Sequence, residues 1–309
     1  MTTRQVARAG LALSHRIIDL AGPRLHLNLG RLGRPIEEIQ KMDDGMTADN
    51  RLAQVSPPAK KYLGGSMNRV IRIVSRLGEV RATVEDDFHH FRVVVQHDGQ
   101  RVVRAFSDAP RSPFTLCPAA GARLSELVGQ PLTTQLTALT EKIDARNQCT
   151  HQFDLACLSV AMAARGEGQR RYHAVVHDSR DRYTLATLDR DGERVLEWEM
   201  EGDTIVAPYP FCGRTIGSGF TGFVSRELKH EEAEAALVLR RAVFINAGRG
   251  ISEWVDTLPH AMVTGGCWVQ QPEQHQNALR NKGSTLDFTG RVDELTMDDE
   301  AWLDWTEPG

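Results

Sequence analysis

Two cysteines stand where the sequence predicts helices to begin. Cys117 directly precedes Pro118, a residue that favours the first turn of a helix. Cys149 is followed by His151 and Asp154 at the start of a long apolar stretch. The free N–H groups and the dipole at a helix start stabilise a thiolate, so we expect the pKa of both thiols to lie below the usual value of about 8.5. Both helices belong to one short segment, which predicts that the two thiols lie close together.

A run of acids and histidines, residues 85–90 (EDDFHH), supplies the third contribution. If a strand begins at residue 88, His89 shares its face with Phe91, and Asp87 lies just ahead of it on the same side. His90 then points to the opposite face. A carboxylate next to an imidazole can ligate a metal or relay a proton, so this run predicts part of a site.

These residues permit two kinds of chemistry. Thiolate, imidazole and carboxylate ligands suit a tetrahedral zinc ion, and they suit an iron–sulfur species less well. The spacing is not diagnostic, because no CxxC motif occurs. Without a metal, one cysteine would be a nucleophile and one histidine its base. The candidate metal ligands are Cys117, Cys149, His151, His89 and Asp87, and the candidate catalytic residues are Cys149, His151, Asp154 and His89.

Four arginines in the second half of the chain predict an anion-binding surface. Arg240 and Arg241 are adjacent in an expected helix, Arg249 lies between two glycines, and Arg280 opens a polar run. Guanidinium groups bind carboxylates and phosphates through paired hydrogen bonds. We therefore expect these four residues to contact an anionic small-molecule substrate.

The elements that must position these residues are of the α+β class. Alternating apolar residues predict strands at 70–75, 79–85, 88–97 and 101–106, with a hairpin turn at Asp98-Gly99. Three helices are expected next, starting at residue 118, spanning about 136–143, and spanning 150–164. A second antiparallel unit is predicted from strands at 172–177, 183–188, 195–200 and 204–207, followed by one long helix at 231–246.

The order of these expected elements divides the chain into four parts. Residues 1–66 are rich in Gly, Pro and basic residues, which indicates a disordered extension. Gly64-Gly65-Ser66 could also encode a ribosome-binding sequence ahead of Met67, in which case translation would begin there. Residues 67–166 would form the domain that carries the candidate site, and 167–290 a second domain of meander and helix. Residues 291–309 are strongly acidic, and we expect them to form a solvated tail.

The composition limits the classes of function. A formal net charge of −4 gives no field that would attract nucleic acid, and no apolar run is long enough to span a bilayer. The apolar patch near the N-terminus is too short for a secretory signal. Five cysteines at irregular spacing do not form a disulfide framework, which indicates a reducing, cytoplasmic location. The sequence leaves open the oligomeric state and the roles of Cys212 and Cys267.

Several motifs resemble a family of bacterial proteins catalogued as domain of unknown function 2889. They are residues 84–93 (VEDDFHHFRV), 117–118 (CP), 148–151 (QCTH), 154–155 (DL), 283–285 (GST) and 287–288 (DF). The resemblance spans roughly residues 69–288 and implies no known activity.

A more distant likeness is to the scaffold proteins of iron–sulfur cluster assembly. Cys117 and Cys149 fall at the positions of the second and third scaffold cysteines. The first cysteine is absent here, with Asp87 and His89 in its neighbourhood. The lysine-containing approach to the third cysteine is also missing. This likeness implies the geometry of a metal site.

The sequence thus predicts an enzyme of small-molecule metabolism with a metal-type centre built from cysteine and histidine. Two alternatives remain open: an accessory protein that binds a metal or an iron–sulfur cluster, and a metal-free hydrolase or transferase that depends on cysteine.

Overall fold

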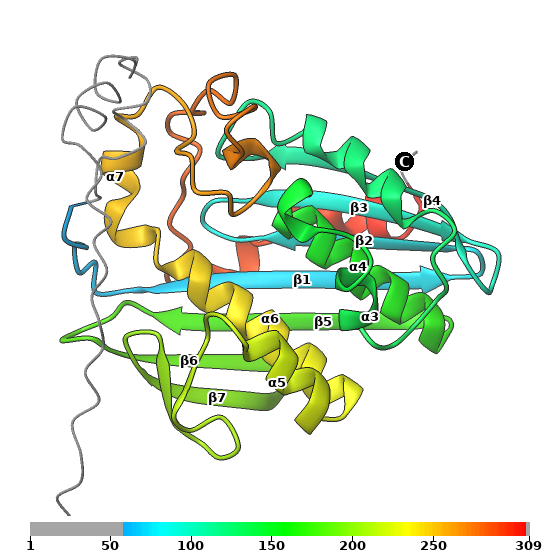
Figure 1. The fold of residues 1–309 in the computed structure, drawn as a ribbon, viewed down its shortest axis with the longest axis horizontal. Coiled ribbons are helices and arrows are strands. Elements are labelled where there is room, and N and C mark those ends of the chain that lie inside the picture. Colours follow the sequence, from blue (N-terminus) through cyan, green and yellow to red (C-terminus); the bar gives the residue numbers. More distant parts are fainter. Residues whose placement is uncertain (1–57, 307–309) are drawn as a thin grey trace, which may run out of the picture. The chain divides into compact units, whose positions relative to one another are not determined.

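One antiparallel sheet of nine strands is the framework on which the candidate site is built. A computed structural model describes residues 58–306 of the chain. The strands follow the order β4-β3-β2-β1-β5-β6-β7-β8-β9 across the sheet (Figure 1). Their bounds are β1 Ser66–Arg76, β2 Glu79–Glu85, β3 His90–His97, β4 Val102–Arg111, β5 Gly168–His177, β6 Tyr183–Arg190, β7 Glu193–Glu201, β8 Thr204–Ala207 and β9 Arg214–Thr215. The predicted α+β class and the expected strands are therefore confirmed.

The sheet continues across the expected domain boundary at residues 166 and 167. Strand β1 pairs with β2 on one side, from Val70 opposite Glu85 onward, and with β5 on the other, from Ser66 opposite His177 onward. Gly166, at a φ of 103°, ends the preceding helix and lets the chain turn directly into β5. The two predicted domains are thus two halves of one sheet, because β5 adds to the free edge of β1.

Two long helices cover one face of the sheet, α4 (Thr150–Arg165) and α6 (His230–Asn246). Helix α4 lies over β1 to β3, and α6 lies over β5 to β7 (Figure 1). Every residue of α4 from Leu155 to Ala163 is buried, as the apolar sequence predicts. The shorter helices are α3 (Thr137–Thr140), α5 (Phe220–Glu227), α7 (Ser252–Val255) and α8 (Glu300–Leu303).

The first two expected helices are shorter or tighter than predicted. The segment after Cys117 is a 3₁₀ helix, η1 (Ala119–Leu127), and Pro118 rather than Cys117 is its N-cap. The second helix is the single turn α3, because residue 141 already ends it. Leu136, Leu139 and Ile143 still pack against the core, so their spacing reflects burial and not a long helix. The other 3₁₀ turns are η2 (Ala145–Asn147), η3 (Arg249–Ile251), η4 (Trp268–Gln270), η5 (Val292–Glu294) and η6 (Met297–Asp299).

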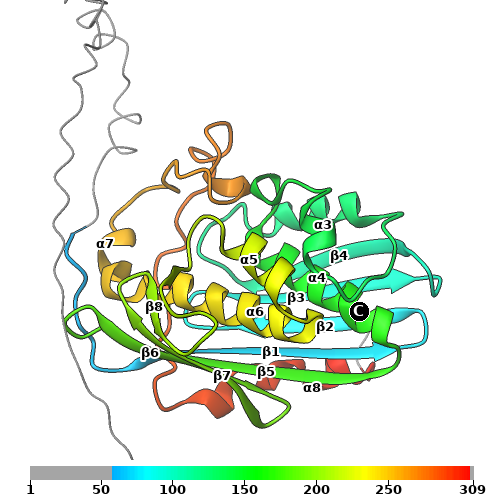
Figure 2. The ribbon, with the colours of Figure 1, turned by 60° about the horizontal axis from the view of Figure 1, so that its bottom comes forward.

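The C-terminal segment packs against the opposite face of the sheet. Figure 2 shows α8 on the side of the sheet away from α4 and α6. Trp302 and Leu303 are buried against Val94. Asp299 is fully buried and accepts hydrogen bonds from Arg92 Nε (2.5 Å) and Thr83 Oγ1 (2.5 Å). The expected solvated acidic tail is therefore a docked segment up to residue 306, because its acids pair with basic and hydroxyl groups on the strands.

The start of the described chain is tied to the rest by backbone contacts. Lys61 N–H donates to the carbonyl of Gly250 (3.0 Å), and Gly65 N–H donates to Asp178 (3.0 Å). The predictions for residues 1–57 and 307–309 lie outside the described residues. No helix within 58–306 is long and apolar enough to cross a membrane.

Candidate functional site

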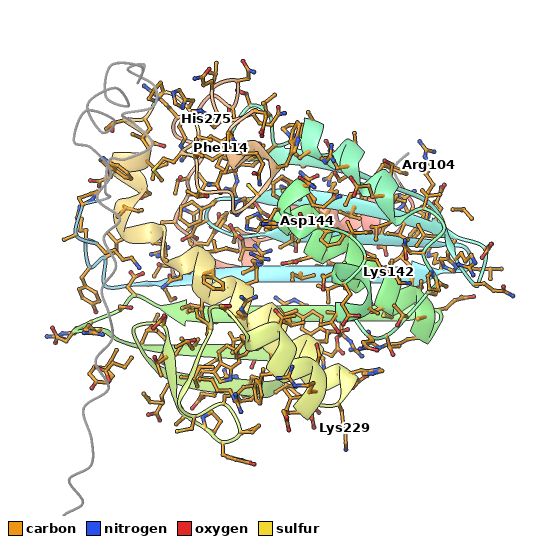
Figure 3. All side chains as sticks on the ribbon, in the orientation of Figure 1. Arg104, Phe114, Lys142, Asp144, Lys229 and His275 are labelled. Atoms are coloured by element: carbon orange, nitrogen blue, oxygen red, sulfur yellow. The ribbon has the colours of Figure 1, made fainter. Side chains whose placement is uncertain are left out.

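Four of the predicted metal-binding or catalytic residues line one pocket of about 740 Å³, named here the histidine pocket. His89 comes from the turn before β3, and Cys117 from the turn before η1. Cys149 and His151 come from the start of α4. The segment from 258 to 282 borders the same pocket and is joined to the sheet side by a β-bridge between Phe114 and Arg280. In Figure 3, the labelled Phe114 lies beside this segment, which also carries His275.

A buried chain of polar contacts leads to His89. Arg69 forms an ion pair with Asp86, and the other carboxylate oxygen of Asp86 lies 3.0 Å from Nδ1 of His89. Asp86 is fully buried. Burial alone would raise the pKa of Asp86, but the imidazole of His89 and the guanidinium of Arg69 hold it below its usual range. An ionised carboxylate only accepts, so Nδ1 of His89 is the donor and Nε2 carries the lone pair.

The local fold explains why Asp86 and His89 meet. The Asp86 carboxylate accepts hydrogen bonds from the backbone N–H groups of Phe88 (2.8 Å) and His89 (2.9 Å). The Asp86 N–H in turn donates to the carbonyl of His89 (2.9 Å). An aspartate that caps its own turn in this way is a common chain reversal. The turn brings the imidazole back over the carboxylate.

A second imidazole is stacked on the first. The rings of His89 and His151 lie 3.8 Å apart between centroids, and the ring of Phe91 flanks them. Burial lowers the pKa of His89 despite the nearby Asp86. Burial and the neighbouring His89 lower the pKa of His151 further. Both imidazoles are therefore neutral near pH 7, and the buried Nε2 of His151 is left without a hydrogen-bond partner among residues 58–306.

Three thiols share the histidine pocket, and burial keeps them protonated. They belong to Cys117, Cys149 and Cys267. Burial raises the pKa of Cys149 to about 12, although backbone N–H groups of Gln152 and His151 act in the other direction. Burial and the nearby Cys149 also raise the pKa of Cys117. The predicted thiolates at helix starts are thus wrong, because the desolvation of a buried thiolate outweighs the helix N-terminus.

Asp87 does not join this group. Its carboxylate pairs with Arg249 and accepts from the backbone N–H of Phe288 (3.1 Å). The turn at Asp86 interrupts the strand alternation that would have put Asp87 beside His89. Within residues 58–306, no three His, Cys, Asp or Glu side chains are arranged to hold a metal ion. The predicted ligands other than Asp87 therefore share a pocket without forming a coordination sphere.

The predicted arginines divide into two groups. Arg240, Arg241 and Arg280 line the histidine pocket. Arg249 lies outside its lining and is bound to Asp87, Asp178 and Asp287. Arg280 has its three nitrogens engaged, with Asp256, the carbonyl of Pro113, and Thr285.

Arg240 and Arg241 differ in how they are paired. Arg241 Nε lies 2.6 Å from Asp154, so Asp154 orients an arginine and does not line the pocket. Arg240 donates to the carbonyls of Ile216 (2.5 Å) and Gly217 (3.3 Å) and forms no ion pair with a described residue. No Asp or Glu is among the described residues that line the pocket. Its walls thus combine uncompensated positive charge with the apolar surface of Phe88, Phe114 and Phe244.

Sequence reasoning missed three contributors. Strand alternation favours Asp87 as the partner of His89, whereas Asp86 holds that place because its carboxylate caps the turn before β3. Arg69 gave no signal, because its partner is known only once β1 and β2 are paired. Cys267 was left without a role, and it reaches the pocket through the irregular segment that bridges to Phe114.

Fold and site together define an α+β protein with an internal pocket lined by histidine, cysteine and arginine. Residues 74–165 match the model of a family described as "Protein of unknown function (DUF2889)". The match confirms the predicted resemblance over that segment, which carries Asp86, His89, Cys117, Cys149 and His151. A comparison with curated proteins finds no match. The likeness to iron–sulfur scaffold proteins stays a prediction.

Proposed function

We propose that the chain is an enzyme that binds an anionic small molecule in the histidine pocket and transfers a proton through His89. The observation that carries this proposal is the buried contact chain from Arg69 through Asp86 to His89. A carboxylate that accepts from Nδ1 fixes the imidazole tautomer and stabilises the imidazolium formed when Nε2 takes a proton. Neutral imidazoles with this support are the usual general bases near pH 7.

The second imidazole supports a reaction with a paired proton transfer. His151 is stacked on His89 and has a buried, unpartnered Nε2. Two adjacent imidazoles rarely both carry charge, so His151 stays neutral while His89 holds a proton. An isomerisation fits this arrangement, in which Nε2 of His89 removes a proton from one substrate atom and the resulting imidazolium returns it to another.

Charge in the pocket supports an anionic substrate. Arg240 has no ion-pair partner among the described residues, and no carboxylate lines the described walls. A substrate carboxylate beside Arg240 and Arg241 would be held by charge-assisted hydrogen bonds. The aromatic rings of Phe88, Phe114 and Phe244 would pack against its apolar part.

Solvent-exchange measurements test the proposal without knowledge of the product. The protein is incubated in D₂O with a panel of aliphatic and aromatic 2-oxo acids, and deuterium at the carbon next to the carbonyl is followed by NMR. We expect catalysed exchange with at least one member. His89→Gln should lower its rate by about 10²–10⁴-fold, since it removes the base. His173→Gln lies outside the pocket, where it contacts Asn68, and serves as the matched control. Exchange that survives His89→Gln, or no exchange across the panel, contradicts the proposal.

A second candidate, a soft-metal site, is supported by the three thiols that line the same pocket. A bound zinc ion would deprotonate Cys117, Cys149 or Cys267 despite their burial, with His151 as a nitrogen ligand. For this, the three thiols would have to move closer to one another. Metal analysis of purified protein tests it: Cys149→Ser and Cys117→Ser should each abolish stoichiometric metal. Cys157→Ser, on the same helix but outside the histidine pocket, should leave it unchanged. A parent protein without metal removes this candidate.

A further inference from the structure

A second cavity lies on the other side of Arg240 and Arg241 from the histidine pocket. Its volume is about 190 Å³, and it is named here the arginine chamber. Arg69, Arg240, Arg241 and Asp154 line it together with aliphatic side chains of β1, β2, α4 and α6. Those of Ile71, Val84, Leu155, Leu158, Leu237 and Val238 belong to this wall. No aromatic residue is among the described residues that line it.

One residue of the chamber wall carries an unmet hydrogen-bond donor. Arg69 is 2% exposed and lines the chamber, and its Nη1 pairs with Asp86. Its Nε is buried and has no hydrogen-bond partner among residues 58–306. Buried N–H groups are almost always paired, so an unpaired one usually faces a ligand or an ordered water.

The charges around the chamber leave one positive charge uncompensated. Asp86 pairs with Arg69, and Asp154 pairs with Arg241. Arg240 has no carboxylate partner among the described residues. Burial and the neighbouring Arg241 lower the pKa of Arg240, and the nearby Asp154 acts in the other direction without forming an ion pair with it. A single negative charge in the chamber would balance it.

We propose that the arginine chamber binds a short aliphatic carboxylate of four or five carbons, distinct from the substrate in the histidine pocket. The carboxylate contacts Arg69 Nε and the guanidinium of Arg240, and the alkyl chain packs against the leucines of α4 and α6. The size follows from the volume: at about 30 Å³ for each water-sized group, 190 Å³ holds roughly six such groups. Butyrate has six non-hydrogen atoms, and isovalerate has seven.

This inference does not rest on the proposed reaction, yet the two sites are connected. Arg69 holds Asp86, and Asp86 holds His89. An anion on Arg69 adds negative charge near the imidazole and stabilises its protonated form. The pKa of His89 therefore rises when the chamber is occupied, which makes the ligand a regulator of the base.

Calorimetry with isovalerate tests the chamber directly on the full chain. Isovaleramide has the same shape without the charge, and acetate has the charge without the alkyl chain. We expect each to bind at least tenfold more weakly than isovalerate. Equal binding of isovaleramide, or no binding of isovalerate at millimolar concentration, overturns the proposal.

Two matched substitutions locate the bound molecule. Leu237→Trp fills the arginine chamber from α6, and Met262→Trp intrudes on the histidine pocket but not on the chamber. We expect Leu237→Trp to weaken isovalerate binding at least tenfold and Met262→Trp to leave it unchanged, with both variants checked for native melting. The reverse pattern would place the carboxylate in the histidine pocket, which refutes the chamber and leaves the proposed reaction intact. If neither variant weakens isovalerate binding, the carboxylate binds elsewhere, and the chamber is refuted as well.

NMR of the labelled imidazoles adds a readout that packing alone would not move. Isovalerate should raise the pKa of His89 in the parent protein and fail to do so in Leu237→Trp. A His89 titration that is the same with and without bound isovalerate removes the regulatory link.

Discussion

At the level of single residues, burial keeps His89 and His151 uncharged while Asp86 stays ionised. This difference in charge comes from the groups that lie next to each side chain. Asp86 has a buried arginine beside it, whereas each imidazole has the other imidazole as its nearest ring. Chemistry at this site therefore begins from neutral nitrogen bases next to a fixed negative charge.

Stability should fall as the pH drops below about 6.5. The pKa of both imidazoles is lower in the folded protein than the usual 6.5, so the unfolded chain binds more protons at acidic pH. Stability is complete above that pH and decreases below it, by up to about 1.4 kcal/mol per pH unit for each imidazole. Urea unfolding from pH 5.5 to 7.5 measures this. His151→Gln should flatten the slope, and Leu188→Ala, buried in β6 away from the imidazoles, should lower stability at every pH without changing the slope.

The thiols of the pocket should react slowly. With a pKa of about 12, Cys149 is almost entirely protonated at pH 7.5, and Cys117 is buried as well. Cys212 is exposed. A short iodoacetamide treatment followed by peptide mapping should therefore label Cys212 first, with Cys117 and Cys149 slower by an order of magnitude or more. Equal labelling of Cys149 would revive the cysteine-nucleophile alternative.

Much of the site was predictable because residue type and order carry its signal. Cys117, Cys149, His151 and His89 were expected together, and all four line one pocket. Arg69, Asp86 and Cys267 could not be chosen from the sequence. Their roles depend on a strand pairing, on a side-chain-capped turn, and on a bridge between residues 114 and 280. The pKa values of the thiols were mispredicted for a related reason, since burial is a property of the fold.

At the level of elements, α4 is both the core of the helical face and the support of the site. Leu155, Leu158 and Met162 are at most 6% exposed. Truncation of any of them to Ala should lower the free energy of unfolding by about 2–5 kcal/mol. Truncation of Leu155 or Leu158 should also enlarge the arginine chamber, which both leucines line. Urea unfolding of the three variants measures the loss. Changes below about half a kcal/mol at all three positions are incompatible with a buried α4.

Strands were predicted more reliably than helices, for a physical reason. Period-two alternation and the Asp98-Gly99 turn determine β2, β3 and β4 locally. The spacing of Leu136, Leu139 and Ile143 is satisfied equally by a helix and by one turn followed by a bend. Which of the two forms is decided by packing against the sheet, and that information is not local.

At the level of the whole molecule, α4 and α6 cover one face of the sheet, and the C-terminal segment covers part of the other. Trp302 is buried between Arg81 and Arg92, whose guanidinium groups lie 5.5 and 5.4 Å from its ring. Trp302→Ala should therefore lower the free energy of unfolding by about 3–5 kcal/mol. Thermal and urea unfolding provide the check, with Met297→Ala as an exposed control in the same segment. A solvated tail would give nearly the parent stability for both variants.

The chain was expected to form two domains, and one sheet spans both halves. The reason is that β5 restarts, after α4, along the free edge of β1. An edge strand in one expected domain and a first strand in the other look alike in sequence. Only their pairing decides between a boundary and a continuous sheet.

Arg240 and Arg241 face both cavities, and this has a thermodynamic consequence. Two anions that draw on the same pair of cations compete for them, so each occupant weakens the other. Linkage makes this penalty reciprocal: the factor by which a carboxylate in one cavity lowers the affinity of the other holds in both directions. A single pair of side chains can thus make two separate binding equilibria report on one another, with no change in the backbone.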